Sequence, residues 1–156
     1  MENKELLSYR SQLIQRLGST AKEFSETCLA VGDPYAPVEA DGWNAHQLAA
    51  HARDVQIHVY GARARLTVSE EKPVFPNFDG DAWNAEHYHA DEPIAKICEE
   101  FLADVRKIIP WLEELPLSAW SRPSRHEVYG EFTMQTWVER MLAHIEEHLA
   151  TLKKAV

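Results

Sequence analysis

Residues 132–154, FTMQTWVERMLAHIEEHLATLKK, decide how this chain folds. Apolar residues recur in this stretch at steps of three and four, which predicts an amphipathic helix over residues 133–153. His144 and His148 are four residues apart, so their imidazoles stack on the inward face about one helical turn apart. The inward apolar positions around them are Met134, Trp137, Met141 and Leu152. This helix therefore places two imidazoles in the expected core, where each needs a hydrogen-bonding partner or a metal ion.

An earlier helix, predicted over residues 44–66, carries a third inward histidine, His51. Asn44 begins a capping box, which fixes the start of this helix. Three buried imidazoles that each lacked a partner would destabilise the fold by about 1–3 kcal/mol apiece, whereas one divalent ion satisfies all three. The pattern therefore indicates a metal site of His51, His144 and His148, while a structural role for each histidine alone stays the alternative.

The remaining sequence predicts an all-α four-helix bundle with antiparallel neighbours. Apolar stripes indicate helices over residues 2–30 and from about Pro93 onward, with an end or a kink at Pro110. Proline, glycine and polar residues predict loops, at most with a short helix at 81–87, over residues 31–42, 69–90 and 115–132. No strand is expected, and residues 1–156 are predicted to form a single domain.

The composition narrows the possible partners of the protein. The 156 residues are 45% hydrophobic and 26% charged, and the net charge of -9 argues against nucleic acid, which needs clustered Lys and Arg. No apolar run approaches the length of a membrane span, and the first residues lack the apolar part of a secretory signal. Cys28 and Cys98 show no CxxC spacing. We therefore expect a cytoplasmic protein with reduced, buried thiols and no membrane partner.

Polar residues close to the histidines in the sequence are candidates for supporting roles. Asp54 lies three residues after His51, where its carboxylate could orient the imidazole, although a solvated charge beside Arg53 is the alternative. His126 lies in the second long connection and is expected to be exposed. Long loops in compact domains are often functional, so a pocket beside the metal is predicted to be lined by Trp83, Asn84, His87 and Trp137.

Two known metal motifs fit this sequence poorly. The Glu-x-x-His motif of di-iron bundles is needed on two helices, but it occurs once, at Glu86 and His89, within a predicted loop. The segment HIEEH also fits an inverted zinc-protease motif in which Glu147 would be the base. That motif takes a third ligand from well downstream, and only eight residues follow His148, so we do not expect a peptidase.

The same residues give the chain a family resemblance along nearly its whole length. Three segments carry it: GWNAHQLAAHARD at 42–54, FDGDAWN at 78–84 and GEFTMQTWVERMLAHIEEHLATL at 130–152. The sequence resembles the DinB/YfiT-like superfamily of four-helix metalloproteins, which includes mycothiol-dependent maleylpyruvate isomerases and bacillithiol S-transferases. On this resemblance, His51, His144 and His148 occupy the positions of the three metal ligands. Thr151 departs from the family, where glutamine is common after the last ligand.

The resemblance implies a chemistry as well as a fold. Three neutral imidazoles leave a coordination position open, as in catalytic sites, and zinc or nickel is the expected divalent metal. The resemblance implies that a low-molecular-weight thiol binds the metal and attacks a small-molecule substrate, as a transferase or an isomerase. Asp54 and Glu147 are the candidates for supporting roles beside the metal ligands. The resemblance also suggests a homodimer. A non-catalytic metal-binding stress-response protein and a hydrolase using metal-bound hydroxide stay open as alternatives.

Overall fold

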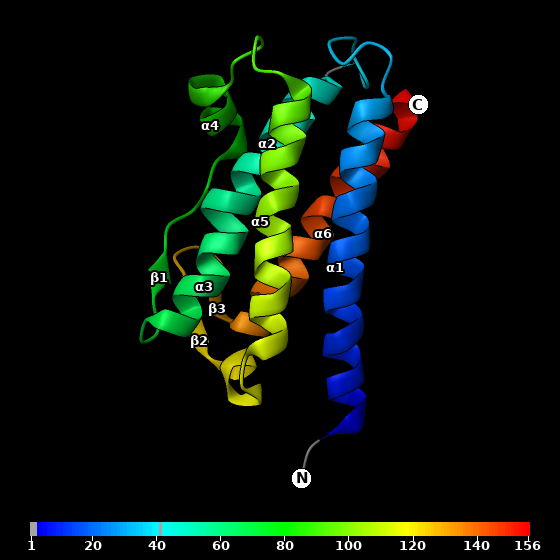
Figure 1. Ribbon diagram of the computed structural model, residues 1–156. Coiled ribbons are helices and arrows are strands. Elements are labelled where there is room, and N and C mark those ends of the chain that lie inside the picture. Colours follow the sequence, from blue (N-terminus) through cyan, green and yellow to red (C-terminus); the bar gives the residue numbers. More distant parts are fainter. Residues whose placement is uncertain (1–2, 41) are drawn as a thin grey trace.

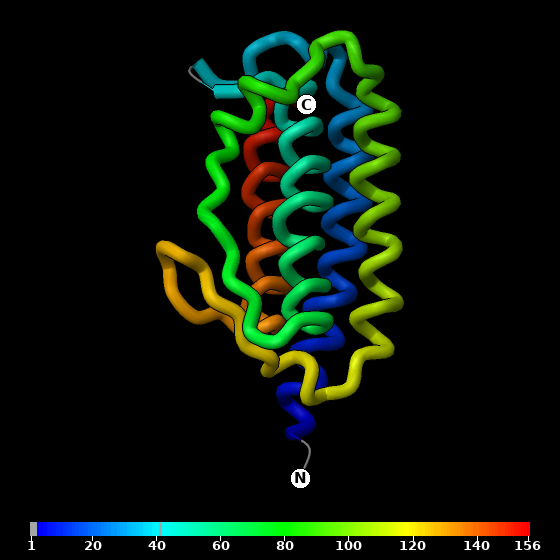
Figure 2. Tube along the Cα trace, turned by 90° about the vertical axis from the view of Figure 1, so that its left-hand side faces the viewer, coloured from blue at the N-terminus to red at the C-terminus, as the bar shows by residue number. Residues whose placement is uncertain are grey.

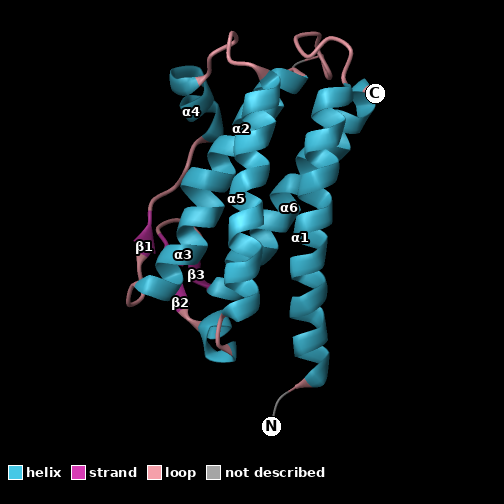
Figure 3. Cartoon of the chain, in the orientation of Figure 1, coloured by secondary structure: helices cyan, strands magenta, loops and turns pink. Residues whose placement is uncertain are grey.

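A computed structural model describes residues 3–40 and 42–156 of the protein, and four long helical segments form its bundle (Figures 1 and 3). The predicted four-helix bundle is confirmed, although Glu2, where the first helix was expected to begin, lies outside the described residues. The first helix keeps Gly18 in its interior. The bundle consists of α1 (Lys4–Ala30), the continuous path of α2 (Ala45–Val55), η1 (Gln56–Tyr60) and α3 (Gly61–Ser69), α5 (Ile94–Glu114) and α6 (Met134–Leu152).

The helix directions match the expected antiparallel arrangement only in part, because the neighbouring pairs α1–α5 and α3–α6 are antiparallel and two other pairs are not. Figure 2 shows that α1 and α6 run one way along the bundle, whereas α2, α3 and α5 run the other way. The neighbouring pairs α1–α6 and α2–α5 are therefore parallel. The reason is the connection over residues 70–93, which passes back along the length of the bundle through β1 (Val74–Phe75) and α4 (Gly80–His87). As a result, α5 begins at the same end of the bundle as α2.

Side-chain caps fix the starts of the helices that carry the histidines. The Asn44 side chain accepts a hydrogen bond from the Gln47 backbone N–H, and the Gln47 side chain accepts one from the Asn44 N–H, so the predicted capping box is present. Thr133 caps α6 by accepting from the Thr136 N–H. Helix α5 continues past Pro110 to Glu114, so this proline does not end the helix.

The core lies along the bundle axis. Phe24 of α1 and Phe101 of α5 pack edge to face with ring centroids 5.2 Å apart, and both are almost fully buried. Both cysteines are free and buried, as predicted. Among the described helices, none combines the length and the apolar character needed to cross a membrane. Burial of these apolar side chains fixes how the helices that carry the histidines face one another.

A π-helical turn, η1, interrupts the second helix of the bundle, which the sequence predicts as a regular helix. Single π turns within α-helices occur frequently at functional sites. The Gln56 side chain, at the start of η1, donates a hydrogen bond to the Asp104 carboxylate of α5 at 3.0 Å. A Cβ at Gly61 would lie 2.5 Å from the Gln56 carbonyl oxygen, so the backbone closes tightly on the turn. The turn changes which residues of α3 face the interior.

A small three-stranded sheet replaces part of the predicted loops, so the expectation of no strands is wrong. Its strands are β1, β2 (Pro123–His126) and β3 (Gly130–Thr133), in the order β1-β2-β3. β1 pairs parallel to β2, and β2 pairs antiparallel to β3 through a turn that ends at Gly130, whose φ of 86° favours glycine. Two short 3₁₀ helices, η2 (Leu117–Ser121) and η3 (Lys153–Ala155), follow α5 and α6.

We expect Ser124→Ala to lower the free energy of unfolding by about 1–3 kcal/mol, because it leaves a buried indole N–H without an acceptor. The Trp137 Nε1–H of α6 donates to Ser124 Oγ of β2 at 2.7 Å, in a fully buried contact. Chemical denaturation measures the change. Ser121→Ala, at the exposed serine that ends η2 just before this strand, is the control. Equal stabilities of the two variants would contradict this role of Ser124.

Candidate metal centre

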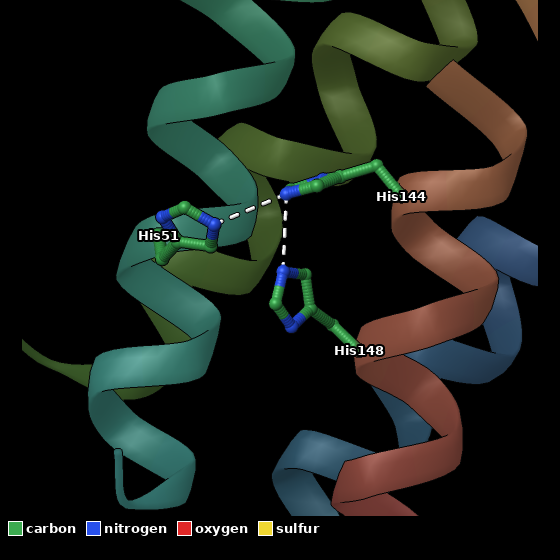
Figure 4. Close-up of side chains that lie close together, drawn as sticks. All are labelled: His51, His144 and His148. Carbon is green, nitrogen blue, oxygen red and sulfur yellow. Dashed lines mark hydrogen bonds between the residues drawn. The ribbon is translucent and has the colours of Figure 1, made fainter. Parts of the chain in front are cut away.

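Three histidine side chains from α2 and α6 meet at one point inside the bundle (Figure 4). The Nε2 atom of His144 lies 3.0 Å from the Nε2 atom of His51 and 3.0 Å from that of His148. One nitrogen atom from each of the three rings lies within 4.8 Å of the corresponding atoms of the other two rings. The structure therefore brings together the three residues that the sequence singles out.

The three imidazoles are held neutral by their surroundings. Burial and the neighbouring His148 lower the pKa of His51 to about 4. Burial also lowers the pKa of His144 well below its usual value, with His148 and His51 adding to the effect. For His148, burial lowers the pKa and the Glu147 charge opposes this shift. Near pH 7 each ring therefore keeps a nitrogen lone pair free, which is the form that binds a metal ion.

His46, on the same helix as His51, shows what a structural histidine looks like in this fold. Its ring is fully buried, Nδ1 lies 2.7 Å from the Tyr88 hydroxyl and Nε2 lies 2.6 Å from the Glu92 carbonyl oxygen. Within the described residues, the Nε2 atoms of His51, His144 and His148 instead have only one another as partners. A purely structural role, in which a buried histidine has its own hydrogen-bonding partners, therefore fits His46. It does not fit His51, His144 and His148.

The donor set suits a divalent transition metal. Nitrogen ligands at about 2.0–2.1 Å from a tetrahedral ion lie about 3.3 Å from one another, close to the 3.0 Å separations found here. Neutral imidazoles bind zinc, nickel, copper and iron, and three of them leave at least one coordination position for another ligand. His51, His144 and His148 would therefore hold the ion, and the donor chemistry is that of an open site.

The His51 ring is enclosed on two sides. The indole of Trp43 lies against it with ring centroids 4.5 Å apart. On another side is Gly80, the first residue of α4, where an added Cβ would lie 2.9 Å from His51 Cε1. Among the described residues, His51 Nδ1 is the single fully buried side-chain nitrogen or oxygen without a hydrogen-bonding partner. Packing, rather than a carboxylate, therefore positions this imidazole.

Asp54 and Glu147 do not hydrogen-bond to the histidine rings that they were expected to orient. The Asp54 carboxylate accepts hydrogen bonds from Arg53 Nε at 2.9 Å and Trp83 Nε1 at 3.1 Å, and no bond joins it to His51 in the described part of the chain. It is buried, so it is not a solvated charge either. Glu147 is exposed and acts on His148 through its charge. Neither residue orients a metal-binding ring through a hydrogen bond.

A pocket of about 440 Å³ opens beside the histidines and includes His51 and His144 in its lining. Of the four predicted pocket residues, Trp137 lines it, whereas Trp83, Asn84 and His87 do not. These three belong to α4, where the Trp83 and His87 rings stack with centroids 3.8 Å apart and Asn84 is buried. The pocket lies instead toward the sheet.

Six polar residues of this pocket were not predicted from the sequence: Tyr60, Arg63, Asn77, His126, Tyr129 and Arg140. His126, expected to be exposed, is only 3% exposed because β2 alternates buried and exposed side chains. The alternation over residues 123–126, followed by Gly130, is a weak hairpin signal that was available in the sequence. Tyr60 ends the π turn and Arg63 follows it, and the sequence gives no signal for this turn.

We expect Gly80→Ala to weaken zinc binding by about 10–100-fold, because the new methyl group would displace the His51 ring. Competition with a chromogenic zinc chelator measures the affinity, and circular dichroism verifies that the helices persist. Gly32→Ala is the matched control, since a Cβ there meets nothing within 4 Å. Unchanged affinity in Gly80→Ala would show that this contact does not hold the ring.

The lowered pKa values predict that the metal-free protein loses stability as the pH falls from about 6.5 toward 4. In that window the unfolded chain takes up protons on these histidines and the folded chain does not, so acid favours unfolding. For His51 alone, the shift from 6.5 to about 4 corresponds to about 3 kcal/mol, reached below pH 4.

The measurement is urea denaturation in a chelator at several pH values between 7.5 and 4.5. We expect His51→Asn to show a smaller loss of stability with acid than the parent protein, whereas His89→Asn, at an exposed histidine, should behave like the parent. Parallel pH profiles of the parent and His51→Asn would contradict the predicted neutral ring.

Comparison with known proteins agrees with this site and fold. The chain is 25% identical over 141 residues to "Putative metal-dependent hydrolase OB0413" of Oceanobacillus iheyensis. The aligned region covers 90% of this chain and 78% of that protein. Its fold matches that of YfiT from Bacillus subtilis, described as "a probable metal-dependent hydrolase with an unusual four-helix bundle topology", with a TM-score of 0.84. The match covers 99% of this chain and 88% of YfiT at 18% identity, which establishes a common fold.

The sequence pattern of the DinB superfamily matches residues 27–152, a range that contains all three histidines and the whole pocket. The resemblance seen in the three sequence segments is thereby confirmed. The chain belongs to the DinB superfamily.

Proposed function

We propose that this protein is a divalent-metal-dependent enzyme that activates a nucleophile for attack on a small molecule. The observation that carries the proposal is the pocket of about 440 Å³ that shares His51 and His144 with the metal centre. A protein that only stores or senses a metal has no need of such a space beside the ion. When bound, the metal supplies a site at which a thiol or a water molecule loses its proton near neutral pH.

A low-molecular-weight thiol is the nucleophile that the pocket supports best. Among the described residues, none that lines the pocket is Asp or Glu, so no carboxylate is in place to act as a base for water. A free thiol has a much lower pKa than water, so a divalent ion held by the histidines would keep a thiol deprotonated at neutral pH more completely than a water molecule. The pocket volume also leaves room for a thiol and a second small molecule.

Two side chains next to the histidines can stabilise negative charge that develops on the substrate. Burial raises the pKa of Tyr60, so its hydroxyl stays protonated and can donate a hydrogen bond. Its ring lies 5.4 Å from the His144 ring between centroids. His126 Nδ1 accepts from the backbone N–H groups of Val128 and Tyr129, which leaves the proton on Nε2. Both groups are donors fixed before any substrate binds.

Hydrolysis is a second candidate reaction, and the names of the relative from Oceanobacillus iheyensis and of YfiT favour it. The same metal centre would then act on water. The donors that Tyr60 and His126 provide would serve an ester or an amide equally well.

A single experiment tests both reactions. The zinc- or nickel-loaded protein is assayed for loss of free thiol with several small thiols and a generic electrophile, and for hydrolysis of an ester and amide panel. We expect at least one rate above background, and we expect it to fall to background in His144→Ala together with the bound metal. His89→Ala should retain both metal and rate.

Metal binding without any rate in either panel would contradict the enzymatic proposal and favour a binding protein. Full metal content in His144→Ala would contradict the metal centre itself. Measuring metal content and rates on the same samples separates these two outcomes.

A further inference from the structure

The pocket beside the histidines has a charge opposite to that of the protein. The chain carries 25 acidic and 16 basic residues, with a net charge of -9. Among the described residues, the pocket lining contains two arginines, Arg63 and Arg140, and no carboxylate. A cationic cavity in an acidic protein concentrates anions at that place.

Arg63 is a buried cation whose charge is not balanced by the described part of the protein. Only 8% of it is exposed, and its guanidinium lies 5.1 Å from the Trp137 ring centroid and 5.5 Å from that of Phe75. Nη2 donates a hydrogen bond to the Pro76 carbonyl oxygen at 2.6 Å. No carboxylate of the described residues lies within ion-pair distance of it, although buried arginines are usually paired.

The remaining donors of Arg63 are still reachable. Nε and Nη1 have no hydrogen-bonding partner in the described residues, and neither is fully enclosed, because His51 Nδ1 is the single enclosed atom of that kind. Since Arg63 lines the pocket, these donors are available to a molecule within it. Nη2 carries two hydrogens and uses one of them for Pro76, so one edge of the planar guanidinium, formed by Nη2 with Nε or with Nη1, keeps two donors for a carboxylate or a phosphate.

Two further groups complete the donor surface. His126 holds its proton on Nε2, because Nδ1 accepts from the Val128 N–H at 3.0 Å and the Tyr129 N–H at 3.2 Å. Arg140, on α6 one turn before His144, lies over the Phe132 ring at 5.6 Å from the centroid and forms no ion pair among the described residues. Both line the same pocket as Arg63 and His144.

We propose that Arg63, Arg140 and the Nε2–H of His126 form a subsite for the carboxylate or phosphate group of a small substrate. The inference rests on the proposed function, because it assigns this pocket to the substrate. The aromatic rings of Phe132 and Trp137 line the same pocket as these donors and the histidines, so the substrate carries an apolar or unsaturated part as well as its oxyanion. The subsite sets which molecules bind, while the metal centre supplies the activated nucleophile.

The experiment is an NMR titration of the ¹⁵N-labelled full chain with benzoate, phenyl phosphate and the neutral analogue benzamide. It is done on metal-loaded protein and repeated after chelation, because binding that survives chelation cannot be at the metal. We expect benzoate, phenyl phosphate or both to shift the Trp137 indole resonance with a saturable curve, and benzamide to bind at least about tenfold more weakly. The stronger anion identifies the substrate as a carboxylate or a phosphate.

Variants test the assignment to these residues. Arg140→Gln, at an exposed position, should weaken anion binding about tenfold, and Arg63→Lys, which keeps the charge but loses the forked donors, should weaken it as well. Arg106→Gln, at an exposed arginine of α5, removes the same charge elsewhere and should leave the affinity unchanged. Equal binding of benzamide and benzoate, or equal losses in Arg140→Gln and Arg106→Gln, would overturn the subsite.

The same data separate this inference from the proposed function. If the metal-loaded protein has no thiol-transfer or hydrolytic rate but still binds benzoate through Arg140, the subsite stands and the catalytic proposal fails. If rates depend on His144 while no anion binds the chelated protein, the subsite fails and the catalytic proposal stands.

Discussion

The convergence of three imidazole nitrogens on one point is the constraint around which this molecule is arranged. His51 comes from α2 and the other two rings come from α6. The 3.0 Å separations therefore fix how far α2 is shifted along α6 and how each helix is rotated about its own axis. A slip of one residue would turn a ring by about 100° away from the others. The apolar core and the helix caps hold that register. The rings contribute little stability without a bound ion, because among the described residues their Nε2 atoms have only one another as partners and His51 Nδ1 has none.

The small sheet belongs to the site as much as the helices do. Ser124 of β2 holds the Trp137 indole, and His126, on the same face of that strand, turns its ring toward the pocket. The residue after β1, Pro76, accepts the hydrogen bond that anchors Arg63. The bundle therefore supplies the metal-binding rings, and the sheet supplies much of the wall that faces them. With the pocket wall and the three histidines on different elements, the wall can vary while the histidines stay fixed.

The three histidines that the sequence singles out, and that the structure brings together, lie on regular helices. His51, His144 and His148 were found because a 3.6-residue period assigns each to an inward face and because capping residues mark where those helices begin. Arg63 was not predicted because an irregular turn separates it from His51. It follows His51 by twelve positions, which in a regular α-helix is a rotation of about 120°, and the π turn η1 takes up about one extra residue and brings it back toward the pocket. His126 was missed because four-residue strands give almost no periodic signal, and the parallel pairing of β1 with β2 joins segments about fifty residues apart.

The returning segment between α3 and α5 has a consequence for how relatives of this protein can diverge. It contributes Asn77, Phe78 and Gly80 to the rim of the cavity, yet it packs along the outside of the four helices and carries none of the three ring nitrogens. Insertions or substitutions there change the lining of the pocket without disturbing the interior of the bundle. In a fold of this kind, substitutions in one surface segment can change which molecules enter the pocket, while the three histidines keep their positions.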